Sequence, residues 1–217
     1  MNSISSLKHR KLFAGIAIAA IAGLPLAACS SNSDTPTVAK PVAPVDALTG
    51  QSTAIKLDKG FTDALTSLKL TPGVVGSAKL TAGSLVFPIT GGNVTYFKPG
   101  TASPYVIGQI QHEGSGLSLT AGSTKVKLTN LNVDPGSSRV YGDVSVNGKT
   151  AVTSAYLFQL DGRTLKPLKT EGSTAILTGT KVEISPVAAD LLDSTFKTTA
   201  VKGGLLVGIA TITINTK

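Results

Sequence analysis

The middle of the chain alternates apolar and polar residues, which is the pattern of β-strands that bury one face. The clearest stretch runs from Pro104 to Gly148, where glycine-containing turns interrupt the alternation at short intervals. Similar runs flank it on both sides. The strands expected from these runs are Ala54–Leu57, Ala78–Leu80, Leu85–Ile89, Asn93–Phe97, Tyr105–His112, Leu117–Thr120, Lys125–Leu128, Arg139–Val146, Ala151–Leu160, Thr174–Leu177, Lys181–Ile184 and Leu205–Ile214.

Turn residues between these runs indicate antiparallel hairpins. Gly91-Gly92, Asn147-Gly148 and Asp161-Gly162 are pairs that tolerate positive φ in two-residue turns. Pro135-Gly136 and Thr178-Gly179 mark further turns. Short strands joined in this way are typical of all-β domains.

Two segments have helical periodicity instead. Asp58 is a suitable N-cap for a helix from Lys59 to Leu68, which Thr71-Pro72-Gly73 would end. Ser185 caps a second helix from Pro186 to Phe196, with Val187, Leu191, Ala188 and Leu192 expected to face inward. The expected fold is mainly β: an antiparallel β-sandwich or barrel-like domain with two short covering helices.

The two predicted helices open in the same way. Ile55-Lys56-Leu57-Asp58 precedes the first helix and Val182-Glu183-Ile184-Ser185 precedes the second. One hypothesis is an approximate twofold repeat of strand–helix units. The other is that two unrelated helices cover open ends of the β structure.

Residues 1–28 have the organisation of a secretory signal peptide. Lys8-His9-Arg10-Lys11 is a basic start, and a run of Ala, Ile, Leu and Gly follows up to Leu26, Ala27 and Ala28. Together with Cys29 these last residues resemble the bacterial lipobox. The resemblance implies cleavage before Cys29, a diacylglycerol thioether on its sulfur, and a lipid-anchored protein in the cell envelope. The anchor would lie on the outer face of the cell membrane, or in the outer membrane if the host has one.

The rest of the chain divides into a tether and a domain. Residues 29–52 contain three prolines and small polar residues without periodicity, which predicts a flexible extended linker. Residues 53–217 form the expected single β-rich domain.

Composition narrows the classes of function. Lys and Arg number 20 and Asp and Glu 12, and removing three basic residues of the signal leaves a net charge of +5. The lysines are scattered singly without a stacking platform of aromatic residues, so nucleic acid is not an expected partner. The single cysteine, Cys29, excludes an internal disulfide and a cysteine-based metal site.

Catalysis has little support in the sequence. His112 is the only histidine after the signal segment, and no G-x-S-x-G elbow is present. One histidine cannot form the usual metal ligand sets. We therefore expect no enzyme, no catalytic residues and no metal site.

The domain resembles an uncharacterised family of secreted and lipid-anchored proteins, chiefly of actinobacteria. The resemblance is carried in order along nearly the whole domain. It includes the segments Leu57–Leu68, Val86–Gly92, Gly108–Leu117, Val126–Asp134 and Ala155–Leu160. It implies a fold and no assigned activity.

The segment Gly108–Leu117 reads G-x-I-x-H-x-G-x-G-L, and a predicted hairpin and the stretch Asp134–Val144 follow it. Together they are similar, more distantly, to part of the HtaA-type haem-binding domain of Gram-positive surface proteins. The likeness implies haem held by a tyrosine with a histidine nearby. His112 would be this histidine, and Tyr96, Tyr105 or Tyr141 the tyrosine.

The sequence thus favours a non-enzymatic envelope lipoprotein with a structural or surface-interaction role. The alternative is a module that binds haem or another apolar molecule. A large apolar cavity within the β layers would favour the alternative. Two close carboxylates near His112 would favour an enzyme, and a fully packed core the structural role.

Overall fold

The computed structural model describes residues 38–216. The expected signal peptide (residues 1–28) and the lipobox residues Leu26, Ala27, Ala28 and Cys29 lie outside this range, so these assignments stay predictions. Residues 38–216 contain no helix with the length and apolar character needed to cross a bilayer.

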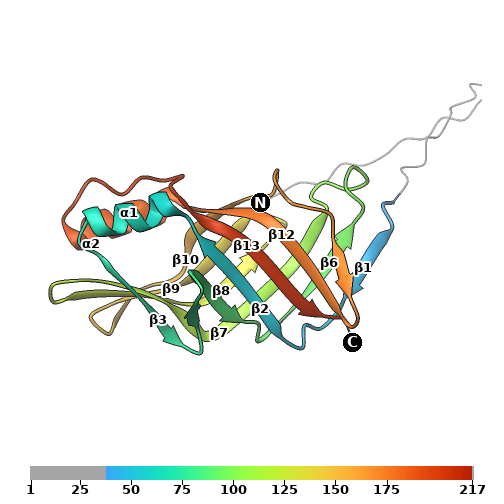
Figure 1. The fold of residues 1–217 in the computed structure, drawn as a ribbon, viewed down its shortest axis with the longest axis horizontal. Helices are drawn as coiled ribbons and strands as arrows, with labels where there is room; N and C mark the ends of the chain where they lie inside the picture. The colour runs from blue at the N-terminus through green and yellow to red at the C-terminus, as the bar shows by residue number, and fades with distance from the viewer. Residues whose placement is uncertain (1–37, 217) are drawn as a thin grey trace, which may run out of the picture. The chain divides into compact units, whose positions relative to one another are not determined.

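The described chain forms one antiparallel sheet of thirteen strands with two helices at one end (Figure 1). This confirms the expectation of a mainly β domain with two helices. The strands are β1 Pro41–Val45, β2 Gln51–Leu57, β3 Thr71–Gly76, β4 Lys79–Thr81, β5 Ser84–Pro88, β6 Gly91–Phe97, β7 Val106–Ala121, β8 Thr124–Asp134, β9 Arg139–Val146, β10 Lys149–Asp161, β11 Lys169–Glu171, β12 Thr174–Ile184 and β13 Leu206–Asn215.

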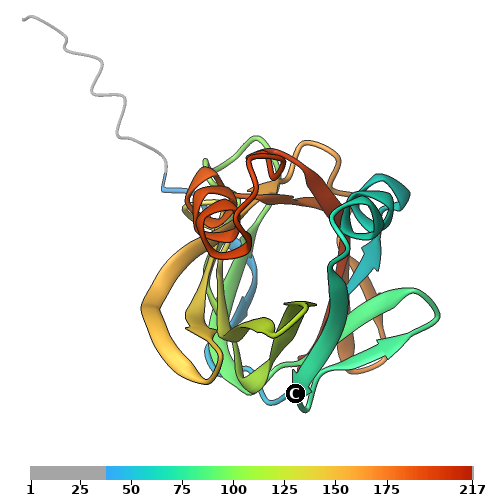
Figure 2. The same cartoon turned by 90° about the vertical axis from the view of Figure 1, so that its left-hand side faces the viewer.

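The sheet curls so that its two halves face each other (Figure 2). Its order is β1-β6-β7-β8-β9-β10-β12-β13-β2-β5-β4, with β3 paired to β7 and β11 to β12. Thr90, just after β5, donates its backbone N–H to the Gln111 carbonyl of β7 at 2.9 Å, which ties the two halves together. Within residues 38–216 the end strands β1 and β4 are not paired with each other, so the sheet is sandwich-like and does not close into a barrel.

Irregularities at neighbouring points of β7, β8 and β10 accompany the curvature of the long strands. Side chains satisfy backbone groups that these irregularities free. Asn130 Oδ1 accepts from the Gly114 N–H at 3.1 Å, and Asn130 Nδ2 donates to Asp143 Oδ2 at 2.9 Å. Asp143 Oδ1 accepts from the Ser154 N–H at 3.0 Å. We call Asn130, Asp143 and Ser154 the outer polar column.

The helices are capped as the sequence predicts. Helix α1 (Lys59–Ser67) begins after Asp58, whose side chain accepts from the Gly60 N–H at 2.8 Å. Helix α2 (Pro186–Phe196) begins after Ser185, whose hydroxyl accepts from the Ala188 N–H at 3.0 Å. Both satisfy N–H groups that a helix start leaves without a partner.

One inward-facing residue of α2 was predicted wrongly. Val187 is 48% exposed, whereas α2 buries Ala188, Ala189 and Leu192. The two strand–helix units also differ in topology. The strand after α2, β13, pairs with the strand before it, β12, whereas β3 after α1 pairs with β7. This difference argues against an internal twofold repeat.

The folded unit begins earlier than expected, and residues 38–52 are not a free tether. Strand β1 pairs with β6, and Leu48 is only 6% exposed. The prolines of β1, Pro41 and Pro44, are compatible with pairing because β1 is an edge strand, where a missing N–H can face away from the ladder.

Other differences arise where glycine was interpreted as a turn. Thr71-Pro72-Gly73 belongs to β3 rather than to a connection. Thr178-Gly179 lies inside the continuous strand β12, where the register shifts. Gly179 has a φ of 114°, and a Cβ there would lie 2.4 Å from the Thr164 carbonyl oxygen, so only glycine fits this irregularity.

Candidate functional site

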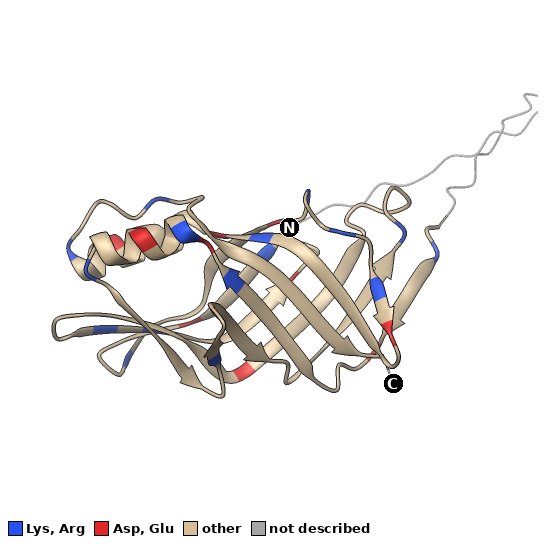
Figure 3. Cartoon of the chain, viewed as in Figure 1, with Lys and Arg blue, Asp and Glu red and all other residues tan. Residues whose placement is uncertain are grey.

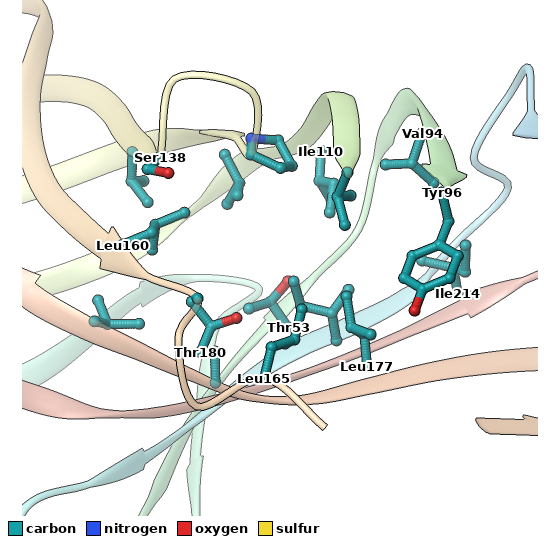
Figure 4. A pocket seen from close by; sticks show the side chains of 18 of the residues that line it. Thr53, Val94, Tyr96, Ile110, Ser138, Leu160, Leu165, Leu177, Thr180 and Ile214 are labelled. Atoms are coloured by element: carbon teal, nitrogen blue, oxygen red, sulfur yellow. The ribbon is translucent and has the colours of Figure 1, made fainter. Parts of the chain in front are cut away.

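An apolar cavity of about 310 Å³ lies between the two halves of the curled sheet. Most of its lining residues, 23 of 34, are Val, Ile, Leu, Phe and Ala, contributed by strands from both halves. Figure 4 shows labelled residues of opposite strands around this common space, among them Ile110, Leu160, Leu177 and Ile214. The volume falls within the range of small-molecule sites, about 300–1,000 Å³.

Period-two alternation places these side chains inside. Ala210, Ile212 and Ile214 are alternate residues of β13 and all line the cavity. Thr53 and Ile55 do the same on β2. Successive side chains of a strand point to opposite faces, so each strand gives one row to the interior.

The cavity has an open end and a buried end. Ser103, Pro104, Gly162 and Thr216 line it and are exposed, so they mark its mouth. The polar residues Thr53 and His112 line it in the buried core, together with apolar residues such as Phe87. The ring of His112 meets the Phe87 ring edge-on, with 6.3 Å between ring centroids.

His112 joins the two sheet halves inside the core. Its side chain is 2% exposed. Nδ1 lies 3.1 Å from the Leu131 carbonyl of β8, and Nε2 lies 2.8 Å from Thr53 Oγ1 of β2. A carbonyl can only accept, so Nδ1 carries the proton, and the neutral ring accepts at Nε2 from the Thr53 hydroxyl.

Burial keeps this histidine neutral. Desolvation lowers the His112 pKa from 6.5 to about 4, while the hydrogen bond to Leu131 raises it by less. No Asp, Glu, Lys or Arg of residues 38–216 lines the cavity. Charged residues are instead spread over many elements of the domain (Figure 3).

Two of the three candidate tyrosines lie near the mouth. Tyr96 and Tyr105 both line the cavity and meet edge-on, with 6.1 Å between ring centroids. The Tyr105 hydroxyl donates to the Gly162 carbonyl at 3.4 Å. Burial, and then the neighbouring Tyr96, raise the Tyr105 pKa. The Tyr105 phenol is therefore neutral near pH 7.

These tyrosines are far from His112. Tyr96 pairs with Val106 of β7, and His112 is six residues farther along that strand. At about 3.4 Å per residue this separation is about 20 Å. The structure thus brings Tyr96, Tyr105 and His112 to one cavity but not into one cluster.

Tyr141 belongs to a different surface. It is absent from the cavity lining and packs against Tyr156, with 6.1 Å between ring centroids. Arg139 lies over the Tyr156 ring, 4.7 Å from its centroid. Tyr141 also lines a polar depression that it shares with the outer polar column and with His112.

Thr53 is the site residue that the sequence did not reveal. A usable signal existed, because Thr53 shares a face with Ile55 in a short alternating run. A hydroxyl on the buried face of a strand needs a partner in the core. The sequence could not show that this partner is His112, 59 residues away.

Comparison with known proteins gives a fold and no family. No family model matches the sequence, and neither does any curated protein. The C-terminal domain of HtaA from Corynebacterium glutamicum is similar in structure, with a TM-score of 0.54 and 12% identity over 78% of this chain and 98% of that one. The haem-binding protein HtaB of the same organism has a TM-score of 0.49 and 10% identity over 78% and 94%. The described domain is therefore similar in fold to the C-terminal domain of HtaA, as the HtaA-type likeness of the sequence had suggested.

Proposed function

We propose that the domain is a non-enzymatic module that binds an apolar small molecule inside its curled sheet. One observation carries the proposal: an open-mouthed apolar cavity of about 310 Å³ occupies the place where a purely structural sandwich would have packed side chains. Burying apolar surface of a ligand there supplies the binding free energy.

The residues do not fit haem held as the HtaA likeness implies. That arrangement needs a tyrosine beside the histidine, and about 20 Å of strand separates His112 from Tyr96. Tyr141 shares the outer depression with His112 but not the cavity, and both ring nitrogens of His112 are bonded inside the core. Thr53 already engages the free ring nitrogen of His112. No Lys or Arg of residues 38–216 lines the cavity to pair with propionates. The cavity, rather than an iron site, supports the proposal.

A titration with N-phenyl-1-naphthylamine, an uncharged dye that fluoresces in apolar sites, tests the proposal. We expect saturable enhancement with the chain carrying Cys29→Ala. Ala210 is buried and lines the cavity, so Ala210→Leu fills it and should weaken binding at least ten-fold.

Ala155→Leu is the matched control, because Ala155 is equally buried but does not line the cavity. It should leave dye binding unchanged in any folded sample. Absence of saturable binding, or equal loss in both variants, would contradict the proposal. A parallel haemin titration, followed at the Soret band, tests the haem alternative directly.

The proposal includes attachment of the module to a membrane through Cys29. Two or three acyl chains hold a protein firmly on a bilayer, at about 0.8 kcal/mol per buried CH₂. Cys29→Ala should therefore move the chain from the membrane fraction to the soluble fraction of the producing bacterium. A Ser30→Ala control should stay with the membrane. Retention of Cys29→Ala on washed membranes would contradict a lipid anchor.

A further inference from the structure

We infer that the cavity takes an uncharged, elongated apolar chain with at most a hydroxyl at its inner end, and not haem or another apolar anion. The inference rests on the proposed function and specifies its ligand class. Charge, shape and the one inner polar pair each support it.

The charge of the lining excludes an ionised ligand group deep inside. No Asp, Glu, Lys or Arg of residues 38–216 lines the cavity. His112 cannot serve as a cation near pH 7, because desolvation lowers its pKa to about 4. A carboxylate without a charged partner in such surroundings strongly disfavours binding, whereas a neutral chain meets mainly apolar walls with a few neutral hydroxyls such as those of Ser138 and Thr180.

The shape favours a chain over a flat ring system. Along β7 the lining extends at least from Val106 to His112, which is about 20 Å at about 3.4 Å per residue. A cavity of about 310 Å³ that reaches this far along one strand is elongated, and an extended hydrocarbon or isoprenoid chain can follow its length.

The polar pair at the buried end selects the end group. The Thr53 hydroxyl donates to His112 Nε2, and His112 Nδ1 donates to the Leu131 carbonyl. The Thr53 hydroxyl proton and the His112 Nδ1 proton are therefore both already donated, while Thr53 Oγ1 keeps a lone pair that can accept a hydrogen bond. A ligand hydroxyl can donate to it, but a carbonyl or carboxylate finds no donor.

Retinol and retinoate are suitable probes, because they share one polyene chain and differ in head-group charge. We would titrate the Cys29→Ala chain with each at alkaline pH, where retinoate is ionised, and with haemin. The expected result is saturable retinol binding, with retinoate and haemin at least ten-fold weaker.

A cation placed at the mouth of the cavity should reduce the preference for retinol over retinoate. Ser103 is exposed and lines the cavity. Ser103→Lys should strengthen retinoate binding several-fold. Because the buried end accepts no charge, retinoate can only enter tail first, without the inner hydrogen bond that retinol makes, and its carboxylate at the mouth would then meet the lysine. Retinol binding should not change, and Ser103→Gln, long but uncharged, should resemble the parent for both probes.

The outcomes separate this inference from the proposed function. Retinoate or haemin binding as tightly as retinol would overturn the inference and leave the proposed function standing. Binding of N-phenyl-1-naphthylamine without binding of retinol would do the same. Failure of all four probes would overturn the proposed function and the inference with it.

Discussion

Strands β7 and β8 carry a polar group on each side, and the two groups are built in opposite ways. On the inner side, His112 and Thr53 are buried and neutral. On the outer side, Asn130 and Asp143 of the outer polar column reach water and include a charge. In the outer column, Asn130 and Asp143 bond to each other and accept from backbone N–H groups of irregular strands, whereas the inner pair joins β2 to β7 and β8 across the core.

This difference indicates which group can take part in binding. The side-chain oxygens of Asn130 and Asp143 already accept from backbone N–H groups where β7 and β10 are irregular, so they are not available to a ligand. The inner pair leaves Thr53 Oγ1 with a free lone pair at the cavity wall. A buried polar pair also depends far more on its protonation state than an exposed one, because water cannot replace a lost partner.

The largest expected effect is therefore a pH dependence of the free energy of unfolding that arises from His112. Its pKa is lowered from 6.5 to about 4 in the folded protein, so the unfolded chain binds the proton more tightly. The contribution to stability is complete above pH 6.5 and is lost as the pH falls toward 4. The free energy of unfolding should fall by about 2–3 kcal/mol between pH 7.5 and 4.5.

Urea titrations across this pH range measure the effect, and His112→Gln should remove most of the slope. The carboxylates with lowered pKa values, Asp143 and Asp161, titrate below this window and do not imitate it. If the variant does not fold, the ring ¹⁵N chemical shifts of His112 in the parent protein, followed against pH, give the pKa directly. A His112 ring that protonates near pH 6.5 would contradict the buried neutral pair.

A smaller effect is expected at Thr53. Thr53→Val keeps the side-chain shape but removes the donor to His112 Nε2, which leaves a buried acceptor without a partner. This should cost about 2 kcal/mol of unfolding free energy in urea titrations. Thr62→Val on α1 is a control that removes an exposed hydroxyl bonded to the Lys59 carbonyl. An equal loss of unfolding free energy in the two variants would show that the buried Thr53–His112 hydrogen bond stabilises the fold no more than an exposed one.

The contrast between the two groups also explains what the sequence could predict. Alternation and capping residues are local signals, so most strands and both helices followed from them. His112 was selected because it is the single histidine after the signal segment, and it does line the cavity. Tyr96 and Tyr105 line it too, but Tyr141 does not.

Features that depend on contacts distant in sequence could not be predicted. Alternation shows that Thr53 faces inward but not which strand lies opposite it. Glycine and asparagine with positive φ occur in turns and in irregular strands alike, so Asn130 and Gly179 gave no signal that the strands continue through them. Strand β1 was missed because prolines favour a linker locally, and only the sheet edge at β6 makes pairing possible.

The smallest expected effect lies in the outer polar column. Asp143→Ala removes the acceptor of the Ser154 N–H and of Asn130 Nδ2, but water can reach both donors. We expect a loss of about 1 kcal/mol, half or less of the loss in Thr53→Val. Asp143→Asn should lose less, because its amide oxygen can still accept from Ser154. Urea titration measures both variants, and dye binding in the cavity should stay unchanged. If Asp143→Ala instead weakened dye binding as strongly as Ala210→Leu, the column would control the shape of the cavity, and the separation between the two groups would fail.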